Sequence, residues 1–356
     1  MVRQIIFAVP GELTIPTGGY AYDRRIVAEL GALRWSPEVI NLGEGFPFPD
    51  AMTRMAAHQL LQALPGDSPI VIDGLAFGAL PEVAEQLGAS HDLIALVHHP
   101  LALESGLSPD DSEVLRVSER RALACARRVI VTSPFTARLI ISDYGIPADR
   151  VAIAPPGVDR APRARAIPDA PLALLAVGAI VQRKGYDVLL AALARLVDLR
   201  WSLTIVGDRG RDSDAAARLD RDIARFDLAD RVIVAGAVPA AQLAALYAQA
   251  DLFVLASRFE GYGMAFAEAI AHGLPVVGTT AGAIAETVPA GVGLLVPPDD
   301  IEAFALALRR LIGDSAERRR LAEAAWREAA KFPDWRRSAE SFSEAIETAV
   351  RHCEVR

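Results

Sequence analysis

Short, nearly uninterrupted apolar runs that alternate with longer helical patterns constrain the fold of this chain more than any other feature. The runs occupy residues 5–9, 39–42, 70–73, 93–97, 129–132, 151–153, 172–177, 203–207, 232–234, 252–255, 275–278 and 294–296. Because they are continuous rather than alternating, they predict strands that are buried on both faces of a sheet. Helix-sized segments such as Tyr20 to Leu33 and Ser112 to Arg127 lie between them. The order predicts an α/β fold with doubly wound, Rossmann-like parallel sheets.

The rhythm breaks once, in residues 155–171, where five prolines and several arginines stand close together. A chain of 356 residues is long enough for two domains. We therefore expect an N-terminal domain over 1–160, a linker over 161–171, a second domain over 172–332 and a final helical segment over 333–356. Two such sheets predict a cleft between the domains, with ligands at the carboxyl ends of the strands.

Composition excludes several classes of protein. The net charge is −8 with no basic tail, so nucleic acid is an unfavourable partner. Cys125 and Cys353 show neither CxxC nor metal-ligand spacing, which favours free thiols in the cytoplasm. The longest apolar stretch, about residues 170–181, is shorter than the ~20 residues of a membrane helix. We expect a soluble protein, at most in peripheral contact with the inner face of a membrane.

Two loops of the first half are candidates for ligand binding. Gly18 and Gly19 precede a helix, whose N-terminus offers unpaired N–H groups to an anion. An ordinary flexible loop would look the same. His98 and His99 follow the run 93–97, and we expect one of them in the active site. His98 is preferred because it directly follows the strand.

In the second half, Arg183 and Lys184 lie between a strand that ends before Gly178 and a helix that begins near Asp187. Two cations in such a loop suit a diphosphate, although a solvated basic loop is a common alternative. The loop is not a P-loop, because GxxxxGK[ST] is absent.

The segment RFEGYGMAFAEAI (258–270) carries two glutamates, Glu260 in a loop and Glu268 in the predicted helix 264–271. Gly261 and Gly263 let main-chain N–H groups point at a phosphate with no side chain in the way. Each carboxylate can accept hydrogen bonds from a pair of vicinal hydroxyls. A sugar nucleotide offers two such diols separated by a diphosphate.

Asp212 and Asp214 form a D-x-D pattern, which holds a metal–diphosphate in another transferase architecture. Here the pattern stands at a predicted helix start, where capping explains it better. We therefore expect no metal.

With these motifs assembled, the chain resembles the GT-B-fold glycosyltransferases of family 4, the retaining, nucleotide-sugar-dependent "glycosyl transferases group 1". The resemblance runs along nearly the whole chain and is most specific in the last third. It rests on Gly18-Gly19, His98-His99, SPFTARLI (133–140), PPGVD (155–159), RKG (183–185), EGYGMAFAEA (260–269), GLPVV (273–277) and AGAIAETV (281–288).

The resemblance implies a role for each site residue. Glu260 would hold hydroxyls of the donor sugar, and Glu268 the ribose hydroxyls. Arg183 and Lys184 would stabilise the diphosphate leaving group in place of a metal. The further donor-binding positions are Gly18, Gly19, His99, Gly261, Tyr262, Gly263 and Met264.

His98 would bind the sugar or position the acceptor. The reaction would be a front-face transfer in which the diphosphate helps to deprotonate the acceptor. No cofactor is implied, because the nucleotide sugar is a co-substrate. The final segment resembles the helix that crosses back onto the first domain, with Trp335 in a packing role.

One position departs from the family pattern. Members often have arginine directly after the glycine that ends the first strand of the second domain, whereas this chain has Ala179. Leaving-group stabilisation would then fall on Lys184, supported by Arg183 or Arg209.

Other activities stay open at this point. A tandem Rossmann dehydrogenase would need a G-x-G-x-x-G fingerprint after the first strand, and GELTIPTGG stands there instead. A sugar phosphorylase and a non-catalytic sugar-nucleotide-binding subunit share the fold. A non-catalytic subunit should have lost Glu260 or Lys184.

The donor base and sugar are not readable from the sequence, with UDP-hexose the commonest choice. The acceptor could be a lipid, a polysaccharide or a small molecule. Five arginines in 116–128 could attract an anionic membrane. Residues 1–165 nevertheless hold 15 Lys and Arg against 19 Asp and Glu, so a solvated helix face is the alternative.

Overall fold

The computed structural model describes residues 2–66, 68–104, 106–164 and 170–351, and it divides the chain into two compact units. Unit 1 is Met1–Gly157 together with Pro333–Arg356, and unit 2 is Val158–Phe332. Residues 165–169 of the expected linker, and Cys353, lie outside the described residues. Within the described part of the chain, no helix is both long and apolar enough to cross a membrane.

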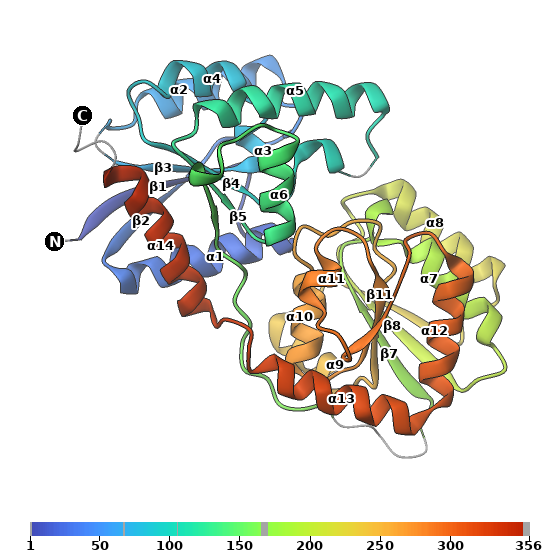
Figure 1. The fold of residues 1–356 in the computed structure, drawn as a ribbon. Helices are drawn as coiled ribbons and strands as arrows, with labels where there is room; N and C mark the ends of the chain where they lie inside the picture. Colours follow the sequence, from blue (N-terminus) through green and yellow to red (C-terminus); the bar gives the residue numbers. More distant parts are fainter. Residues whose placement is uncertain (1, 67, 105, 165–169, 352–356) are drawn as a thin grey trace. The chain divides into compact units, whose positions relative to one another are not determined.

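Unit 1 is built on a six-stranded parallel sheet in the order β2-β1-β3-β4-β5-β6 (Figure 1). The six runs expected in the first half all form strands, and β1, β3 and β4 are buried along most of their length, as continuous apolar runs require. The strands are β1 (Arg3–Val9), β2 (Trp35–Asn41), β3 (Ile70–Asp73), β4 (Leu93–Val97), β5 (Arg128–Val131) and β6 (Val151–Ile153).

Most helices of unit 1 begin at polar caps. Thr17, Asp50 and Ser108 each accept a hydrogen bond from a main-chain N–H in the first turn of the helix that follows. The helices of unit 1 are α1 (Gly18–Leu30), α2 (Ala51–Gln62), α3 (Gly74–Phe77), α4 (Pro81–Leu87), α5 (Pro109–Cys125), α6 (Pro134–Ser142) and α14 (Trp335–Arg351).

Helix α14 belongs to unit 1 although it follows unit 2 in the chain (Figure 1). Trp335 is 6% exposed, and its ring centroid lies 6.0 Å from that of Tyr22. The Phe342 ring stacks on Phe7 with 6.1 Å between centroids. Trp35 Nε1 donates to Ser343 Oγ at 2.8 Å. These contacts confirm the expected return of the final helix to the first domain and the packing role of Trp335.

Unit 2 repeats the architecture, with a parallel sheet in the order β12-β11-β10-β7-β8-β9. Its strands are β7 (Leu172–Val177), β8 (Trp201–Val206), β9 (Val232–Gly236), β10 (Leu252–Val254), β11 (Val276–Thr279) and β12 (Gly293–Val296). Its helices are α7 (Tyr186–Leu193), α8 (Ser213–Arg225), α9 (Ala240–Gln249), α10 (Met264–Ala271), α11 (Ile284–Thr287), α12 (Ile301–Gly313) and α13 (Ser315–Ala329). The unit has its own hydrophobic core.

Two local features of unit 2 bear on the sequence motifs. Asp212 Oδ1 accepts from the Ala215 N–H at 2.9 Å and caps α8, as expected for the D-x-D pattern. The segment after Gly157 packs on unit 2, because His272 Nδ1 lies 3.0 Å from the Pro162 carbonyl oxygen and Ala164 N–H donates to the His272 carbonyl at 2.8 Å.

Candidate functional site

In unit 2, the loop after β7 and the loop after β10 meet at one buried carboxylate, Glu260. Glu260 is 6% exposed, and its Oε1 lies 2.6 Å from Lys184 Nζ and accepts from Ser257 Oγ at 2.7 Å. The guanidinium of Arg183 lies 3.6 Å from Oε2 and donates to the Phe259 carbonyl at 3.0 Å. We call Glu260, Lys184, Arg183 and Ser257 the Glu260 cluster.

The Glu260 cluster keeps a buried carboxylate charged. Burial alone would raise the pKa of Glu260, but the charges of Lys184 and Arg183 and the hydrogen bonds from Lys184 and Ser257 outweigh it and lower the pKa below its ordinary value. The cluster therefore holds a fixed acceptor next to two fixed cations, at the ends of neighbouring strands β7 and β10.

Arg258 ties these two loops together beside the cluster. Its N–H donates to the Arg183 carbonyl at 2.7 Å, and its guanidinium donates to the Gln182 carbonyl and to both oxygens of Asp187, at 3.0 and 2.8 Å. It also pairs with Asp299 at 2.7 Å. A planar guanidinium with several fixed partners restricts the loop that carries Lys184.

Helix α10 begins directly after the cluster, and Gly263 makes its sharp entry possible. Gly263 has φ +95°, in the region that residues with a side chain avoid, and a Cβ there would lie 3.2 Å from the Phe266 ring. Gly261 and Gly263 are buried, Tyr262 and Met264 are half-buried, and the Thr287 hydroxyl donates to the Tyr262 carbonyl.

Glu268 lies on α10 in a different environment from Glu260. Its Oε2 accepts from the Tyr247 hydroxyl at 2.9 Å. Burial, together with the nearby charge of Asp159 and against that hydrogen bond, raises the pKa of Glu268 to about 7. The two glutamates that look equivalent in sequence therefore differ, since Glu260 is ion-paired and no ion pair of Glu268 is found among the described residues.

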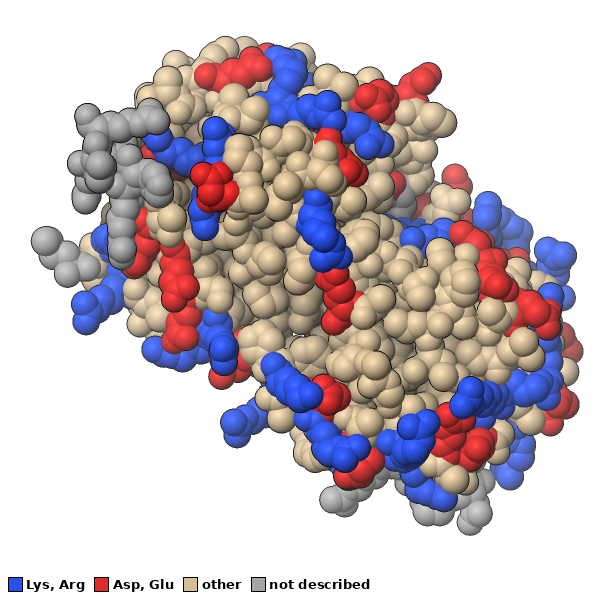
Figure 2. Space-filling view, in the orientation of Figure 1, with Lys and Arg blue, Asp and Glu red and all other residues tan. Residues whose placement is uncertain are grey.

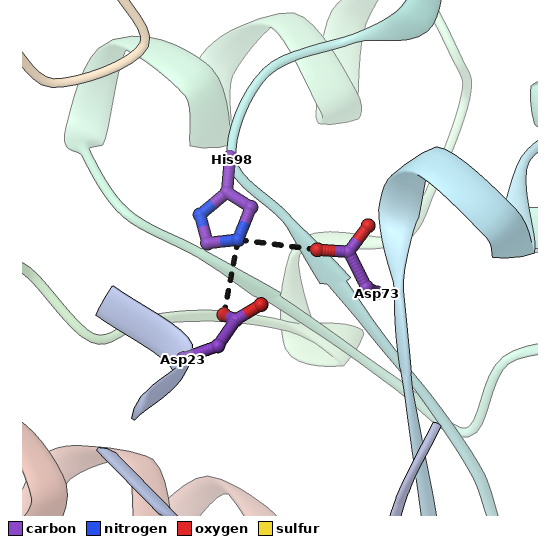
Figure 3. A group of neighbouring side chains, drawn as sticks. All are labelled: Asp23, Asp73 and His98. Atoms are coloured by element: carbon purple, nitrogen blue, oxygen red, sulfur yellow. Dashed lines mark hydrogen bonds and ion pairs between the residues drawn. The ribbon is translucent and has the colours of Figure 1, made fainter. Parts of the chain in front are cut away.

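In unit 1, His98 follows β4 and is held by two carboxylates from other elements (Figure 3). Its Nε2 lies 3.1 Å from Oδ1 of Asp23, on α1, and 3.4 Å from Oδ2 of Asp73, at the end of β3. Both carboxylates are almost fully buried. We call these three residues the His98 trio.

The electrostatics of the His98 trio follow from its geometry. Burial alone would lower the pKa of His98, but the charge and hydrogen bond of Asp23, and then those of Asp73, raise it to about 10. Burial raises the pKa of Asp23 to about 7, with His98 opposing and Asp73 adding to the shift.

The two members of each pair, Gly18 and Gly19 and likewise His98 and His99, lie in different surroundings. A Cβ on Gly19 would lie 3.1 Å from Cδ2 of His98, so Gly19 leaves room for that ring, whereas Gly18 begins α1. His99 turns to another partner, with its Nε2 3.1 Å from Oε2 of Glu104.

Comparison with known proteins decides the family. The Glycosyl transferases group 1 profile matches residues 158–328, and the Glycosyltransferase Family 4 profile matches residues 80–161. The D-inositol 3-phosphate glycosyltransferase of Thermobifida fusca is 30% identical over 324 residues, which are 78% of this chain and 74% of that protein. The chain belongs to glycosyltransferase family 4.

Other relatives of this family 4 chain agree. The D-inositol 3-phosphate glycosyltransferase of Pseudarthrobacter chlorophenolicus is 33% identical over 273 residues, 71% of this chain but only 64% of that relative's length. Sucrose-phosphate synthase of Thermosynechococcus elongatus superimposes with a TM-score of 0.83 at 23% identity, over 97% of this chain and 99% of that one. The HepE protein of Anabaena, solved in complex with UDP-glucose, gives 0.77 at 20% identity over 97% and 99%. This chain shares the GT-B fold with both of these structures.

The sequence analysis did not anticipate several residues that contact Glu260, Glu268 or His98. Ser257 stands just after β10, where the position after a strand could have indicated it. Tyr247 and Asp159 come to Glu268 only through the tertiary fold. Asp73 is the last residue of β3, and its run IVID predicts only a buried strand. Asp23 lies inside α1, and no neighbouring sequence motif indicates that it contacts His98.

Two candidate sources of positive charge have acidic or carbonyl partners within the protein. Arg209 forms an ion pair with Asp220 on α8 at 2.5 Å. Within residues 116–128, Arg116 pairs with Glu113, Arg121 with Glu82 and Glu85, and Arg127 with Asp92. Arg120 and Arg128 donate to the carbonyls of Asp143 and Asp149. Figure 2 likewise shows basic and acidic side chains interspersed over the visible face.

Proposed function

We propose that the protein is a retaining glycosyltransferase that moves a hexose from a nucleotide sugar to a hydroxyl acceptor without a metal ion. The Glu260 cluster carries this proposal. A buried, charged carboxylate with Lys184 and Arg183 beside it offers an acceptor for sugar hydroxyls and cations for a diphosphate within one site.

Each residue has a defined task in this reaction. Glu260 accepts hydrogen bonds from hydroxyls of the donor hexose, and Glu268 accepts from the ribose diol. Lys184 and Arg183 stabilise the negative charge that develops on the diphosphate as its bond to the anomeric carbon breaks. Main-chain N–H groups from Gly261 to Met264 contact the donor, with the N-terminal dipole of α10 behind them.

The acceptor oxygen forms the new bond on the face from which the diphosphate departs, so the anomeric configuration is retained. Its proton passes to an oxygen of the leaving diphosphate. Glu268 is held for ribose by this assignment and is not the displacement nucleophile. His98 contacts the sugar or the acceptor near the anomeric carbon.

A UDP-hexose is the first donor to test, because the HepE structure contains UDP-glucose. A small phosphorylated polyol is the first acceptor, because two relatives carry the name D-inositol 3-phosphate glycosyltransferase. Lipid and polysaccharide acceptors follow in the same panel.

The deciding experiment screens UDP-, GDP-, ADP- and dTDP-sugars for thermal stabilisation and nucleotide release. We expect one donor to stabilise the wild-type protein and to be consumed without added metal. Lys184→Ala should reduce turnover about 100- to 1,000-fold, as for removal of other groups that stabilise developing charge. The matched control is Lys331→Ala, since Lys331 is the only other lysine in the chain and is 72% exposed.

The same assay separates the alternatives. A phosphorylase would release sugar phosphate only when inorganic phosphate is present, and a binding subunit would be stabilised by a donor without consuming it. Proton NMR of the first-formed product reports retention or inversion. The proposal fails if no donor stabilises the protein or is consumed and Glu260→Ala changes nothing.

A further inference from the structure

Neighbouring groups of unit 1 contact the imidazole of His98 at several of its atoms. Asp23 and Asp73 approach its Nε2, Tyr22 meets the ring edge-on at 5.4 Å between centroids, and Gly19 leaves no space for a side chain next to Cδ2. The side chain of His98 is 19% exposed. A ring held in this way has one orientation available to it.

That orientation gives the two ring nitrogens different tasks. Nε2 can contact both carboxylates as a donor only if it carries a proton. Figure 3 shows Nδ1 on the side of the ring away from both carboxylates. No contact of Nδ1 with a described residue of the protein is found. Nδ1 is thus the nitrogen left for a ligand.

The protonation of Nδ1 decides what that ligand contact can be. A neutral ring with its proton on Nε2 would offer a lone pair at Nδ1 and could remove a proton from a hydroxyl. A charged ring would offer an N–H at Nδ1 and could only donate. Two carboxylates beside one imidazole favour the charged ring.

We propose that Asp23 and Asp73 are positioning residues that hold His98 as a fixed imidazolium, so that its Nδ1–H donates to an oxygen of the sugar substrate or the acceptor. His98 is then a hydrogen-bond donor and not a general base. The assignment of the ligand rests on the proposed transferase function, whereas the charge state of His98 does not.

The charges around the trio support this reading. The elements packed against the ring contribute Asp23 and Tyr22 from α1 and Asp73 from β3, and among these groups the carboxylates raise the pKa of His98 to about 10. Oδ2 of Asp23 is buried without a partner among the described residues. Asp23, whose pKa rises to about 7, is thus the member that takes up a proton as the pH falls.

The first experiment needs neither donor nor acceptor. Nitrogen-15 NMR of histidine-labelled full-length protein follows the two ring nitrogens of His98 from pH 6 to pH 9.5, with His98→Asn used for assignment. We expect both nitrogens of the wild type to remain protonated beyond pH 8. Asp73→Asn and Asp23→Asn should each lower the titration midpoint, and the double variant should bring it to or below the ordinary value near 6.5.

Asp110→Asn is the matched control, because Asp110 is an exposed carboxylate on α5, and it should leave the midpoint unchanged. A wild-type His98 that is neutral at pH 7 would overturn the proposal. So would resonances of the trio that shift or broaden on addition of Mn²⁺ and recover with chelator, since that outcome would make the trio a metal site.

The second experiment tests the ligand contact. His98→Asn places an amide near the position of Nδ1 and can still donate, while His98→Ala cannot, and both variants lose the inward contacts to the carboxylates. We expect His98→Asn to turn over the donor about 10-fold faster than His98→Ala, the ratio typical of one hydrogen bond to a polar group. If His98→Asn and His98→Ala both fold and turn over the donor at equal rates while the wild type is active, the proposed contact of Nδ1 with the ligand is wrong, but the charge state of His98 is not affected. Loss of wild-type turnover would instead refute the transferase proposal.

Discussion

At the scale of single residues, Glu260 and Glu268 show how one motif can hold two different groups. Glu260 is ion-paired with Lys184, and its pKa lies below the ordinary value. No ion pair of Glu268 with a described residue is found, and burial raises its pKa to about 7. Their contributions to stability therefore have opposite dependence on pH.

The raised pKa of Glu268 predicts a pH-dependent affinity for the donor. A ribose diol donates to the carboxylate and not to the carboxylic acid, so donor binding should strengthen as the pH rises through about 7. Well below this midpoint the dissociation constant should change about 10-fold per pH unit. Titration calorimetry from pH 5.5 to pH 8.5 measures it.

Two variants of this residue environment check the assignment. Glu268→Gln should bind the donor weakly with little dependence on pH. Tyr247→Phe removes a hydrogen bond that lowers the pKa of Glu268, so the midpoint should move to higher pH. A midpoint that stays near 7 in Glu268→Gln would assign the titration to another group.

The contribution of Glu260 to the free energy of unfolding should fall at acid pH, which is the reverse of the trend for the contribution of Glu268. The folded pKa of Glu260 lies below its unfolded value, so its contribution is complete above the unfolded pKa of about 4.5 and is lost as the pH falls further. Urea unfolding of the wild type and of Glu260→Gln measures this contribution at pH 7 and at pH 3.5. The difference in unfolding free energy between the two proteins should be smaller at pH 3.5. An equal difference at both values would mean that Glu260 is not ionised in the folded protein.

At the scale of elements, the loop before α7 depends on Arg258. Arg258→Lys keeps a positive charge but loses the bidentate contact with Asp187 and the fork to Gln182, so Lys184 becomes less well placed. We expect donor turnover to fall roughly 10-fold while the melting temperature changes little.

Arg309→Lys is the matched control for this variant. Arg309 makes a bidentate contact with Asp198 and donates to a main-chain carbonyl, but it lies on α12 away from the Glu260 cluster. Turnover should stay near wild type in this variant. An equal loss of turnover in both would point to a general effect on stability.

The entry of α10 gives a second prediction at this scale. Gly263→Ala places a Cβ at positive φ and 3.2 Å from the Phe266 ring, so the start of the helix must shift and both stability and donor turnover should fall. Gly291→Ala also has positive φ, at +83°, but nothing lies within 4 Å of its Cβ. It should lose about 1 kcal/mol of unfolding free energy with turnover intact. Chemical denaturation and the donor assay measure both effects.

The elements themselves were largely predictable, for a physical reason that also explains the misses. Continuous apolar runs identified central strands such as β4 to the residue, because burial on both faces leaves no polar position. β2 begins at Trp35 rather than residue 39, since an edge strand tolerates Ser36 and Glu38. Motifs located Glu260 and Lys184, but Asp23 reaches His98 only through the packing of α1 on the sheet.

At the scale of the whole molecule, unit 2 is one continuous segment inserted into unit 1. Its hydrophobic core is drawn from its own residues, whereas unit 1 needs α14 from the far side of the insertion. Residues 158–332 expressed alone should therefore unfold cooperatively, with a core of their own. Circular dichroism melting and proton–nitrogen NMR spectra test this.

Residues 2–157 alone should not form a stable native unit. Without α14, the side chains of Phe342 and Ile346 no longer cover their partners, and burial of each such side chain contributes about 2 kcal/mol. Supplying residues 333–351 as a separate peptide should restore chemical-shift dispersion. A fragment 2–157 that melts cooperatively by itself would contradict this account.

The position of α14 also orders events on the ribosome. Unit 2 emerges and can close its core while the sheet of unit 1 still lacks the helix that covers it. A product that stops before Trp335 would carry an intact Glu260 cluster, whereas unit 1, which holds the His98 trio, would lack α14. Such a product would expose the apolar surface that α14 covers, so it should be cleaved by proteases faster than a chain that includes α14.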